Sequence, residues 1–380
     1  MTCLTNEIKN DLLERGFTRR NFGRIAALVS AGASLPFYTE QAMAQLSAVR
    51  GMPADAVKIN ANENPMGPCK EALEACHAIL AKGGRYQYEE TFAFTELLAE
   101  QEGVKPNYVQ PFAGSSAPLI QSVLGFCSPN KPFVMSDPGY ESGAGAARFI
   151  GAKVLTVPLT KTYAHDVKAM AAASPTAGLI YICNPNNPSG TLTPRADIEW
   201  LVANKPAGSV ILLDEAYTHL TDAPFGSDLV AKDKDVIILR TFSKIYGMAG
   251  LRAGAAIARP DLLRKITPYS GGALPITGMV AATASLKSKK LVPERKKIIA
   301  DIRGDVFSFM DKHGFKYVPS VSNKFMVDVK RPGNEIKNAL EKEKVYVGRI
   351  WSVWPNHLRV SIGTQEEMNK FKTAFLKVMA

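Results

Sequence analysis

Short apolar runs alternate with amphipathic stretches through the middle of the chain. The apolar runs predict buried strands at residues 133–135, 153–157, 179–183, 210–213 and 236–239. Between several of them the apolar residues have helical spacing, as over residues 195–202. Strands that alternate with helices in this way predict an α/β fold, with a mostly parallel sheet sandwiched by helices.

The pattern changes in the last third of the chain. A charged amphipathic stretch predicts a long helix over 291–313. We expect strands at 324–329, 345–347 and 358–362 and helices at 334–342 and 365–379. Strands and helices mixed in this order predict a smaller α+β unit.

The first 44 residues have the composition of an export signal. Arg19, Arg20 and Phe22 precede an uncharged stretch over residues 25–39, and a small-residue site follows at Ala42–Met43–Ala44. A basic region, a short apolar region and a small-residue site are typical of signal peptides, and the arginine pair resembles a twin-arginine signal. We therefore predict a signal over 1–44, transient contact with a bacterial inner membrane and a periplasmic protein. The alternative is an ordinary N-terminal helix or arm on a cytoplasmic protein.

The charge and composition exclude several classes. The 380 residues include 46 Lys and Arg against 35 Asp and Glu, a formal net charge of +11. The densest basic run, over 287–297, has no interleaved aromatic residues and no nucleic-acid motif accompanies it, so we expect no nucleic-acid partner. No uncharged apolar run is long enough for a multi-span membrane protein. The cysteines lack CxxC spacing, so we expect no metal site.

Three polar segments each follow a predicted strand. They are an Asn- and Pro-rich turn over 184–190, the run Asp214–Glu215–Ala216–Tyr217, and a Gly-rich loop over 241–252 that contains Lys244. Each alone is compatible with an ordinary turn, a helix cap or a surface lysine. Ligands in open α/β sheets bind at the carboxyl ends of the strands. The three together predict a ligand site with a lysine suited to imine chemistry.

These segments together resemble the class I/II aminotransferases of fold type I, which use pyridoxal 5'-phosphate. Within them the set is similar to the histidinol-phosphate aminotransferase branch, whose opening motif resembles the run at residues 59–65. The resemblance covers residues 59–364 and implies a seven-stranded type of sheet. It divides the chain into a large cofactor domain over 81–275 and a small domain formed by 45–80 and 276–380.

The resemblance implies a role for each residue around the cofactor ring. Lys244 holds the cofactor as an imine (a Schiff base) and then moves the Cα proton of the substrate. Asp214 pairs with the pyridine nitrogen, so that the ring accepts electrons. Asn187 and Tyr217 hydrogen-bond the ring oxygen, and Tyr140 stacks on the ring.

The cofactor phosphate needs donors and positive charge. A predicted helix over 117–126 follows the serine turn at 114–116, and a helix N-terminus binds anions. The phosphate contacts that the resemblance implies are Gly114, Ser115, Ser116, Ser243 and Arg252. Tyr86 reaches the phosphate from the neighbouring subunit, so we expect a homodimer.

Three residues are implied in substrate binding. Arg359 clamps the α-carboxylate, for which a bidentate guanidinium is suited. Arg349 meets the distal end of the substrate or, in the alternative, forms a salt bridge. Asn64 stands where relatives carry a tyrosine that contacts the substrate. No acidic residue occupies the turn at 114–117, and export does not suit histidine biosynthesis, which is cytoplasmic. The residues therefore indicate an aminotransferase more firmly than they indicate its substrate.

The expected reaction moves an amino group between an L-α-amino acid and a 2-oxo acid. Histidinol phosphate and aromatic or related compounds are the candidate amino donors. One alternative keeps the cofactor and changes the bond broken, as in threonine-phosphate decarboxylases, racemases or other lyases. Another is a non-catalytic cofactor-binding module of a transcription regulator. That module needs a DNA-binding head, for which the segment before residue 59 leaves little room.

Overall fold

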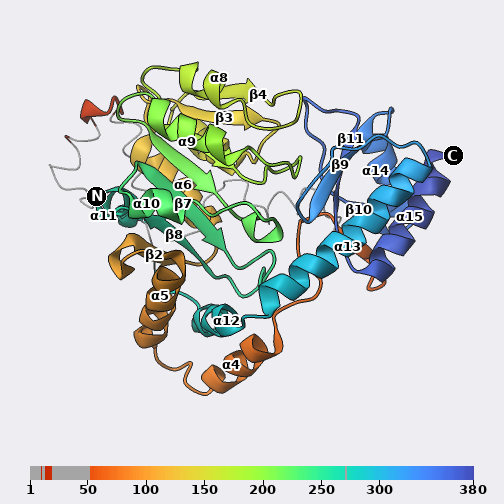
Figure 1. Cartoon of the computed structure of the whole chain (residues 1–380), viewed down its shortest axis with the longest axis horizontal. Coiled ribbons are helices and arrows are strands. Elements are labelled where there is room, and N and C mark those ends of the chain that lie inside the picture. Colours follow the sequence, from red (N-terminus) through yellow and green to blue (C-terminus); the bar gives the residue numbers. More distant parts are fainter. Residues whose placement is uncertain (1–9, 11–12, 19–51, 270–271) are drawn as a thin grey trace.

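A single seven-stranded sheet forms the centre of the molecule (Figure 1). The computed structural model describes residues 10, 13–18, 52–269 and 272–380, so the arginine pair and the small-residue site of the predicted signal lie outside the described residues. The strand order is β2-β8-β7-β6-β5-β3-β4. The strands are β2 Val109–Phe112, β3 Phe133–Asp137, β4 Val154–Pro158, β5 Leu179–Cys183, β6 Val210–Asp214, β7 Val236–Thr241 and β8 Gly254–Ala258.

All five strands predicted from the apolar runs are present, and they pair with one another in parallel. β8 runs antiparallel to both β7 and β2, which makes the sheet mostly but not wholly parallel. The apolar pattern did not predict β2 or β8. β2 is short and contains Pro111, and β8 is composed mainly of alanine, so each has only one of the branched residues that favour strands, Val109 and Ile257.

Helices cover the sheet on both faces (Figure 1). α6 contacts β5 and β6 and packs beside α7 and α11, whereas α8 contacts β3 and α9, and α10 contacts β7 and β8. Every residue of β5, β6, β7 and β8 is buried, as a sheet between two helical layers requires. The helices are α6 Ser116–Phe126, α7 Ser142–Phe149, α8 Val167–Ala172, α9 Arg195–Asn204, α10 Ser227–Ala231 and α11 Pro260–Ile266.

Segments from both ends of the described chain combine in a smaller α+β part. β1 (Val57–Ile59) pairs in parallel with β10 (Val345–Val347), and β9 (Lys324–Asp328) pairs antiparallel with β11 (His357–Ser361). The helices here are α13 Leu291–Lys312, α14 Gly333–Lys342 and α15 Gln365–Met379. A capping box at Thr364 begins α15, because its hydroxyl accepts from the Glu367 N–H and the Glu367 carboxylate accepts from the Thr364 N–H.

The remaining helices link the two parts. α12 (Ile276–Lys287) packs on both α4 (Lys70–Leu80) and α5 (Tyr88–Glu102). Within the described residues there are also three short 3-10 helices, η1 Pro106–Tyr108, η2 Thr218–Leu220 and η3 Thr267–Tyr269. Among the described residues, no helix combines the length and apolar character needed to cross a bilayer.

A short segment before the predicted arginine pair contacts the folded body. The Arg15 guanidinium donates hydrogen bonds to the carbonyls of Leu124 and Cys127, at 2.7 Å and 3.1 Å. These carbonyls lie at the C-terminal end of α6, where cations are favoured. Phe17 is buried, and the Arg15 guanidinium lies 5.2 Å from the centre of its ring.

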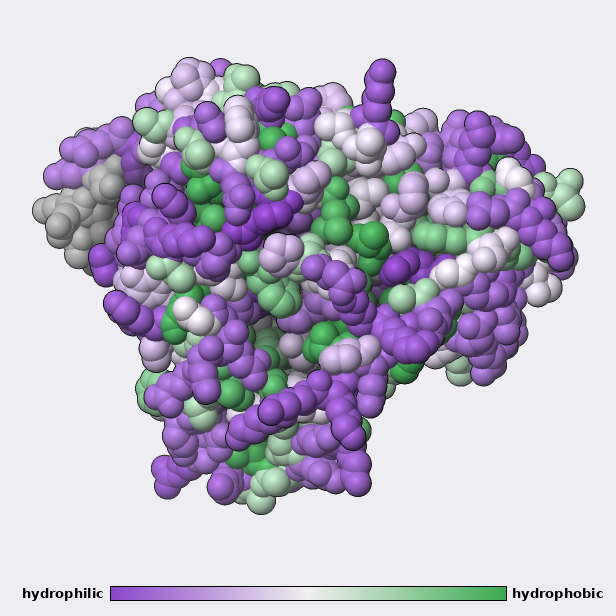
Figure 2. Space-filling model, in the orientation of Figure 1, coloured by the Kyte–Doolittle hydropathy of each residue, from purple (hydrophilic) through white to green (hydrophobic). Residues whose placement is uncertain are grey.

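Hydrophilic residues cover most of the face shown in Figure 2, and hydrophobic residues show mainly toward its centre. Many basic side chains form exposed ion pairs one helical turn apart, such as Lys297 with Asp301 and Lys370 with Glu366. Exposed pairs of this kind contribute little to the free energy of unfolding. Many of the basic residues therefore lie on the solvated surface of the protein.

Candidate active site

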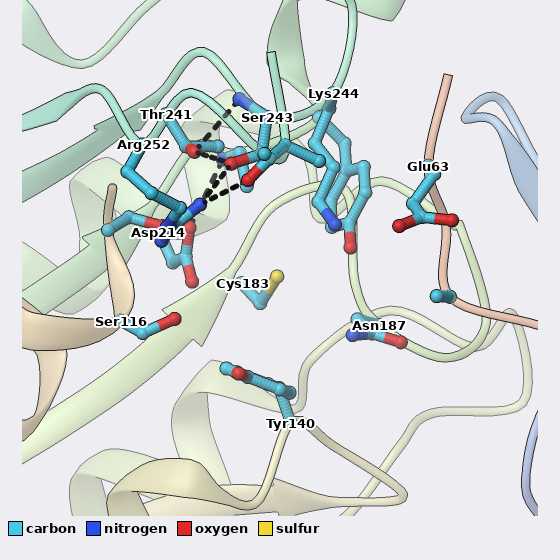
Figure 3. Close-up of a pocket in the computed structure, with 16 residues that line it drawn as sticks. Glu63, Ser116, Tyr140, Cys183, Asn187, Asp214, Thr241, Ser243, Lys244 and Arg252 are labelled. Carbon is cyan, nitrogen blue, oxygen red and sulfur yellow. Dashed lines mark hydrogen bonds between the residues drawn. The ribbon is translucent and has the colours of Figure 1, made fainter. Parts of the chain in front are cut away.

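A cavity of about 200 Å³ opens where the central strands end (Figure 3). Most of its lining comes from the segments that follow β2, β3, β5, β6 and β7, so the cavity lies at the carboxyl edge of the parallel strands. The residues that were predicted from the sequence and line this cavity are Ser115, Ser116, Tyr140, Asn187, Asp214, Tyr217, Ser243, Lys244 and Arg252.

Lys244 projects into the cavity from the loop after β7. Its Nζ lies 5.6 Å from the centre of the Tyr217 ring. Only 9% of the residue is exposed to solvent. The loop is held at the next residue, because the Ile245 carbonyl accepts hydrogen bonds from Asn64 Nδ2 at 2.9 Å and Arg295 Nη1 at 3.0 Å. These two hydrogen bonds fix the backbone next to Lys244.

Asp214 is the last residue of β6; it is buried and lines the cavity. Its Oδ2 accepts a hydrogen bond from the Tyr181 hydroxyl at 2.8 Å, and its Oδ1 accepts one from the Ala216 N–H at 3.1 Å. Burial raises the pKa of Asp214, while these hydrogen bonds and the charges of Lys244 and Lys324 act in the lowering direction. The two hydrogen bonds hold the Asp214 carboxylate in one orientation, as an acceptor for a protonated ring nitrogen requires.

Arg252 and the turn after β2 form a cationic corner. Gly114 has φ of +90°, and a Cβ at this position would lie 2.1 Å from Arg252 Nη2, so a side chain is excluded there. Arg252 Nη1 donates to Ser243 Oγ at 3.1 Å, and Nη2 donates to the Ala113 carbonyl at 2.9 Å. Ser115 and Ser116, at the start of α6, line the same cavity. Together these groups suit a phosphate.

Arg359 on β11 lies next to the cavity residues. Its Nη1 donates to Asn187 Oδ1 at 3.1 Å and its Nη2 donates to the Asn60 carbonyl at 2.6 Å, and only 2% of the residue is exposed. Asn62 Nδ2 donates to Asn187 Oδ1 at 3.5 Å and to the Tyr217 hydroxyl at 3.2 Å. These bonds connect the predicted carboxylate-binding arginine to both residues predicted to contact the ring oxygen.

The other two predicted substrate residues make contacts within the protein. Arg349 forms an ion pair with Glu141, and its guanidinium stacks on Trp351 at 3.9 Å from the ring centre. The sequence predicts a surface salt bridge as the alternative role for Arg349. The observed ion pair is partly buried, with the Arg349 side chain 14% exposed. Asn64, besides its bond to Ile245, accepts a hydrogen bond from the Met66 N–H at 3.1 Å.

Tyr86 lies outside this cavity, immediately before α5. It is 68% exposed and stacks on Tyr88 with ring centres 5.5 Å apart. Within one chain it therefore makes no contact with the cationic corner, which is compatible with its predicted position across a subunit interface.

Several residues of the site were not predicted from the sequence. Cys183 was interpreted as a plain core residue; it is buried but also lines the cavity, beside Asp214 in the strand register. The signal that could have found Tyr181 is the alternation of a strand, since it shares a face with Cys183. Lys324 could have been found because it begins an apolar strand. A lysine in such a run is expected to be buried, and buried lysines are rare.

The sequence is similar to those of known aminotransferases. Residues 54–375 match the model of the family described as "Aminotransferase class I and II". A histidinol-phosphate aminotransferase of Moorella thermoacetica is 33% identical over 337 residues, 86% of each chain. Histidinol-phosphate aminotransferase 2 of Haemophilus influenzae is 35% identical over 335 residues, 86% of this chain and 90% of the relative.

A solved structure extends the similarity to three dimensions. The histidinol-phosphate aminotransferase of Sinorhizobium meliloti, in complex with pyridoxal-5'-phosphate, has a TM-score of 0.80 at 25% identity and covers 93% of this chain and 96% of its own. The chain therefore belongs to the class I and II aminotransferase family. It is an enzyme, and its class is the transaminases.

Proposed function

We propose that this chain is a pyridoxal-phosphate-dependent aminotransferase that moves an amino group between an L-α-amino acid and a 2-oxo acid. The observation that carries the proposal is one cavity that brings together the Lys244 amine, the Asp214 carboxylate and the cationic corner of Arg252. When bound, pyridoxal phosphate supplies a ring that accepts the electrons released at the substrate Cα.

The described residues fit that cofactor. The corner formed by Gly114, Ser115, Ser116, Ser243 and Arg252 offers N–H, hydroxyl and guanidinium donors to the phosphate, and the missing Cβ at Gly114 lets the Arg252 guanidinium lie against this turn. Tyr140 lines the cavity where a ring face would pack. Asp214 would hold a proton on the ring nitrogen, because its oxygens are already oriented by two donors.

Each remaining residue has a task that follows from its position. Lys244 Nζ would take the proton from the substrate Cα and hold it until it is returned in the next step of the reaction. Tyr217 and Asn187 orient the ring through its oxygen. Arg359 binds the α-carboxylate, which replaces the Asn187 oxygen as one of its acceptors. Arg349 contacts the distal end of the substrate only if that end competes with Glu141 for its guanidinium.

The experiment is a half-reaction with single amino donors. Adding a suitable donor, with histidinol phosphate and aromatic amino acids among those screened, should convert the visible absorption of the bound cofactor to that of pyridoxamine phosphate. One equivalent of oxo product should form per active site. A sample without donor is the control. Carbon dioxide release without pyridoxamine phosphate would instead establish the decarboxylase alternative.

The exposed apolar residues around α4 and α5 support a homodimer. Tyr86, Tyr88 and Phe92 are 68%, 54% and 64% exposed, and Leu73 and Leu80 add to this apolar surface. A second copy that covers it would bring its Tyr86 to the phosphate corner of the first. Sedimentation should give a dimer, and Tyr86→Phe should weaken cofactor binding about tenfold by removing one hydrogen bond to a charged group. A monomer with unchanged cofactor affinity in the variant would contradict this arrangement.

The periplasmic location remains a separate proposal, supported by the composition of residues 1–44. Transport by the twin-arginine route carries folded proteins, so the cofactor would be loaded before export. N-terminal sequencing of the native protein should begin near Gln45. A cytoplasmic protein that retains Met1 would contradict the proposal.

A further inference from the structure

A second lysine is buried behind the cavity. Lys324, the first residue of β9, has no solvent-exposed surface, and its Nζ donates to Ser322 Oγ at 3.1 Å. The same nitrogen lies 3.1 Å from the centre of the Tyr217 ring, directly over the face of the ring. β9 belongs to the C-terminal part of the chain and Tyr217 follows β6 of the central sheet, so the contact joins the two parts at the site.

The Tyr217 ring therefore has two lysine nitrogens beside it. Lys244 Nζ lies 5.6 Å from the ring centre and Lys324 Nζ lies 3.1 Å from it. The two nitrogens are consequently no more than about 9 Å apart. Lys324 is itself outside the cavity lining, so it acts on a ligand only through its charge and through Tyr217.

Other charged and titratable groups face the Lys244 nitrogen from the surrounding elements. The acids are Asp214 at the end of β6 and Glu63 from the segment after β1, and both line the cavity. The cations are Arg252 before β8 and Arg359 on β11. The groups that are neutral at ordinary pH are Tyr140, Tyr181 and Cys183. Burial raises the pKa of Tyr181 and of Cys183, which keeps both uncharged.

We propose that Lys324 is a positioning residue for the amino-transfer reaction. Its ammonium holds the Tyr217 ring by a cation–π contact and opposes a second positive charge on the Lys244 nitrogen. The lysine nitrogen thereby stays without its extra proton, and able to accept one from the substrate, down to a lower pH than it would beside Asp214 alone. The positive charge over the ring also strengthens Tyr217 as a hydrogen-bond donor to the cofactor oxygen.

The size of the effect follows from the separation of the charges. Two unit charges within about 9 Å, at an effective dielectric constant of about 20, shift each other's titration by about one pH unit. The inference rests on the cofactor assignment proposed above, because the protonation of the Lys244 nitrogen is followed through the visible absorption of the bound cofactor. It does not depend on the identity of the amino donor.

The test is a pH titration of that absorption in Lys324→Met, which keeps the volume of the side chain and removes its charge. The midpoint should rise by about one pH unit, and in Lys324→Arg it should stay within a few tenths of the wild-type value. Ser322→Ala is the matched control, since it removes the hydroxyl contact and retains the charge, and its midpoint should not move. The pH dependence of cofactor uptake by the apoprotein should shift in the same direction.

A purely structural role for Lys324 predicts a different result. Lys324→Met would then melt at a lower temperature and titrate with the wild-type midpoint, and this outcome would overturn the proposal. If Lys324→Met does not accumulate as folded protein, Lys324→Gln supplies the same comparison with a polar neutral side chain. A wild-type protein that shows no visible absorption with the cofactor would reject the cofactor assignment instead.

Discussion

Replacing Lys244 with alanine is expected to lower the rate of amino transfer by about four orders of magnitude, because the variant lacks the group that moves the Cα proton. The visible absorption of the imine should disappear at the same time, since the amine that forms it with the cofactor is lost. The cofactor itself should still bind through the cationic corner of Arg252. Stopped-flow half-reactions and absorption spectra of the dialysed variant measure the two effects.

Lys161→Ala is the control for this substitution, because Lys161 is exposed and lies in a loop away from the cavity. Its spectrum and its rate should equal those of the wild type. Absorption that survives unchanged in Lys244→Ala would show that the lysine assignment is wrong.

Asp214→Asn is expected to lower kcat/KM by about three orders of magnitude while the chain stays folded. The substitution keeps the shape of the side chain and removes the charge opposite the ring nitrogen, and loss of one partner of a buried charged pair costs about 3–5 kcal/mol. Cofactor affinity, measured by equilibrium dialysis, should fall as well, since the neutral amide no longer favours a protonated ring.

Tyr181→Phe separates the charge of Asp214 from its hydrogen bond. This variant removes the 2.8 Å bond to Asp214 Oδ2 and leaves the carboxylate in place, so kcat/KM should fall by about tenfold at most. An Asp214→Asn enzyme that retains activity within tenfold of the wild type would exclude the proposed role of the carboxylate.

The buried parallel strands were predictable because each is a short, continuous apolar run. β5 and β10 begin and end at the predicted residues, and α15 does as well. β2 and β8 were missed because their stability comes from pairing with neighbours distant in the sequence and not from the residues they contain. The antiparallel direction of β8 has the same origin.

The candidate site likewise contains residues that local patterns predict and contacts that they do not. Lys244, Asp214 and Asn187 follow predicted strands, so sheet topology alone brings them to one edge. The contacts of Arg349 with Glu141 and of Lys324 with Tyr217 join segments far apart in the chain. Such contacts depend on how the C-terminal part packs against the sheet, which local patterns do not determine.

The distribution of the site over the sheet couples cofactor uptake to folding. The cavity is lined from the ends of β2, β3, β5, β6 and β7, which span the sheet from one edge almost to the other. A chain with only some of these strands assembled has no binding site, so the cofactor binds the native state alone. By mass action, free cofactor at 100 times its Kd would then add about 2.7 kcal/mol to the free energy of unfolding of the entire sheet. A higher concentration of free cofactor would thereby raise the folded fraction of this protein.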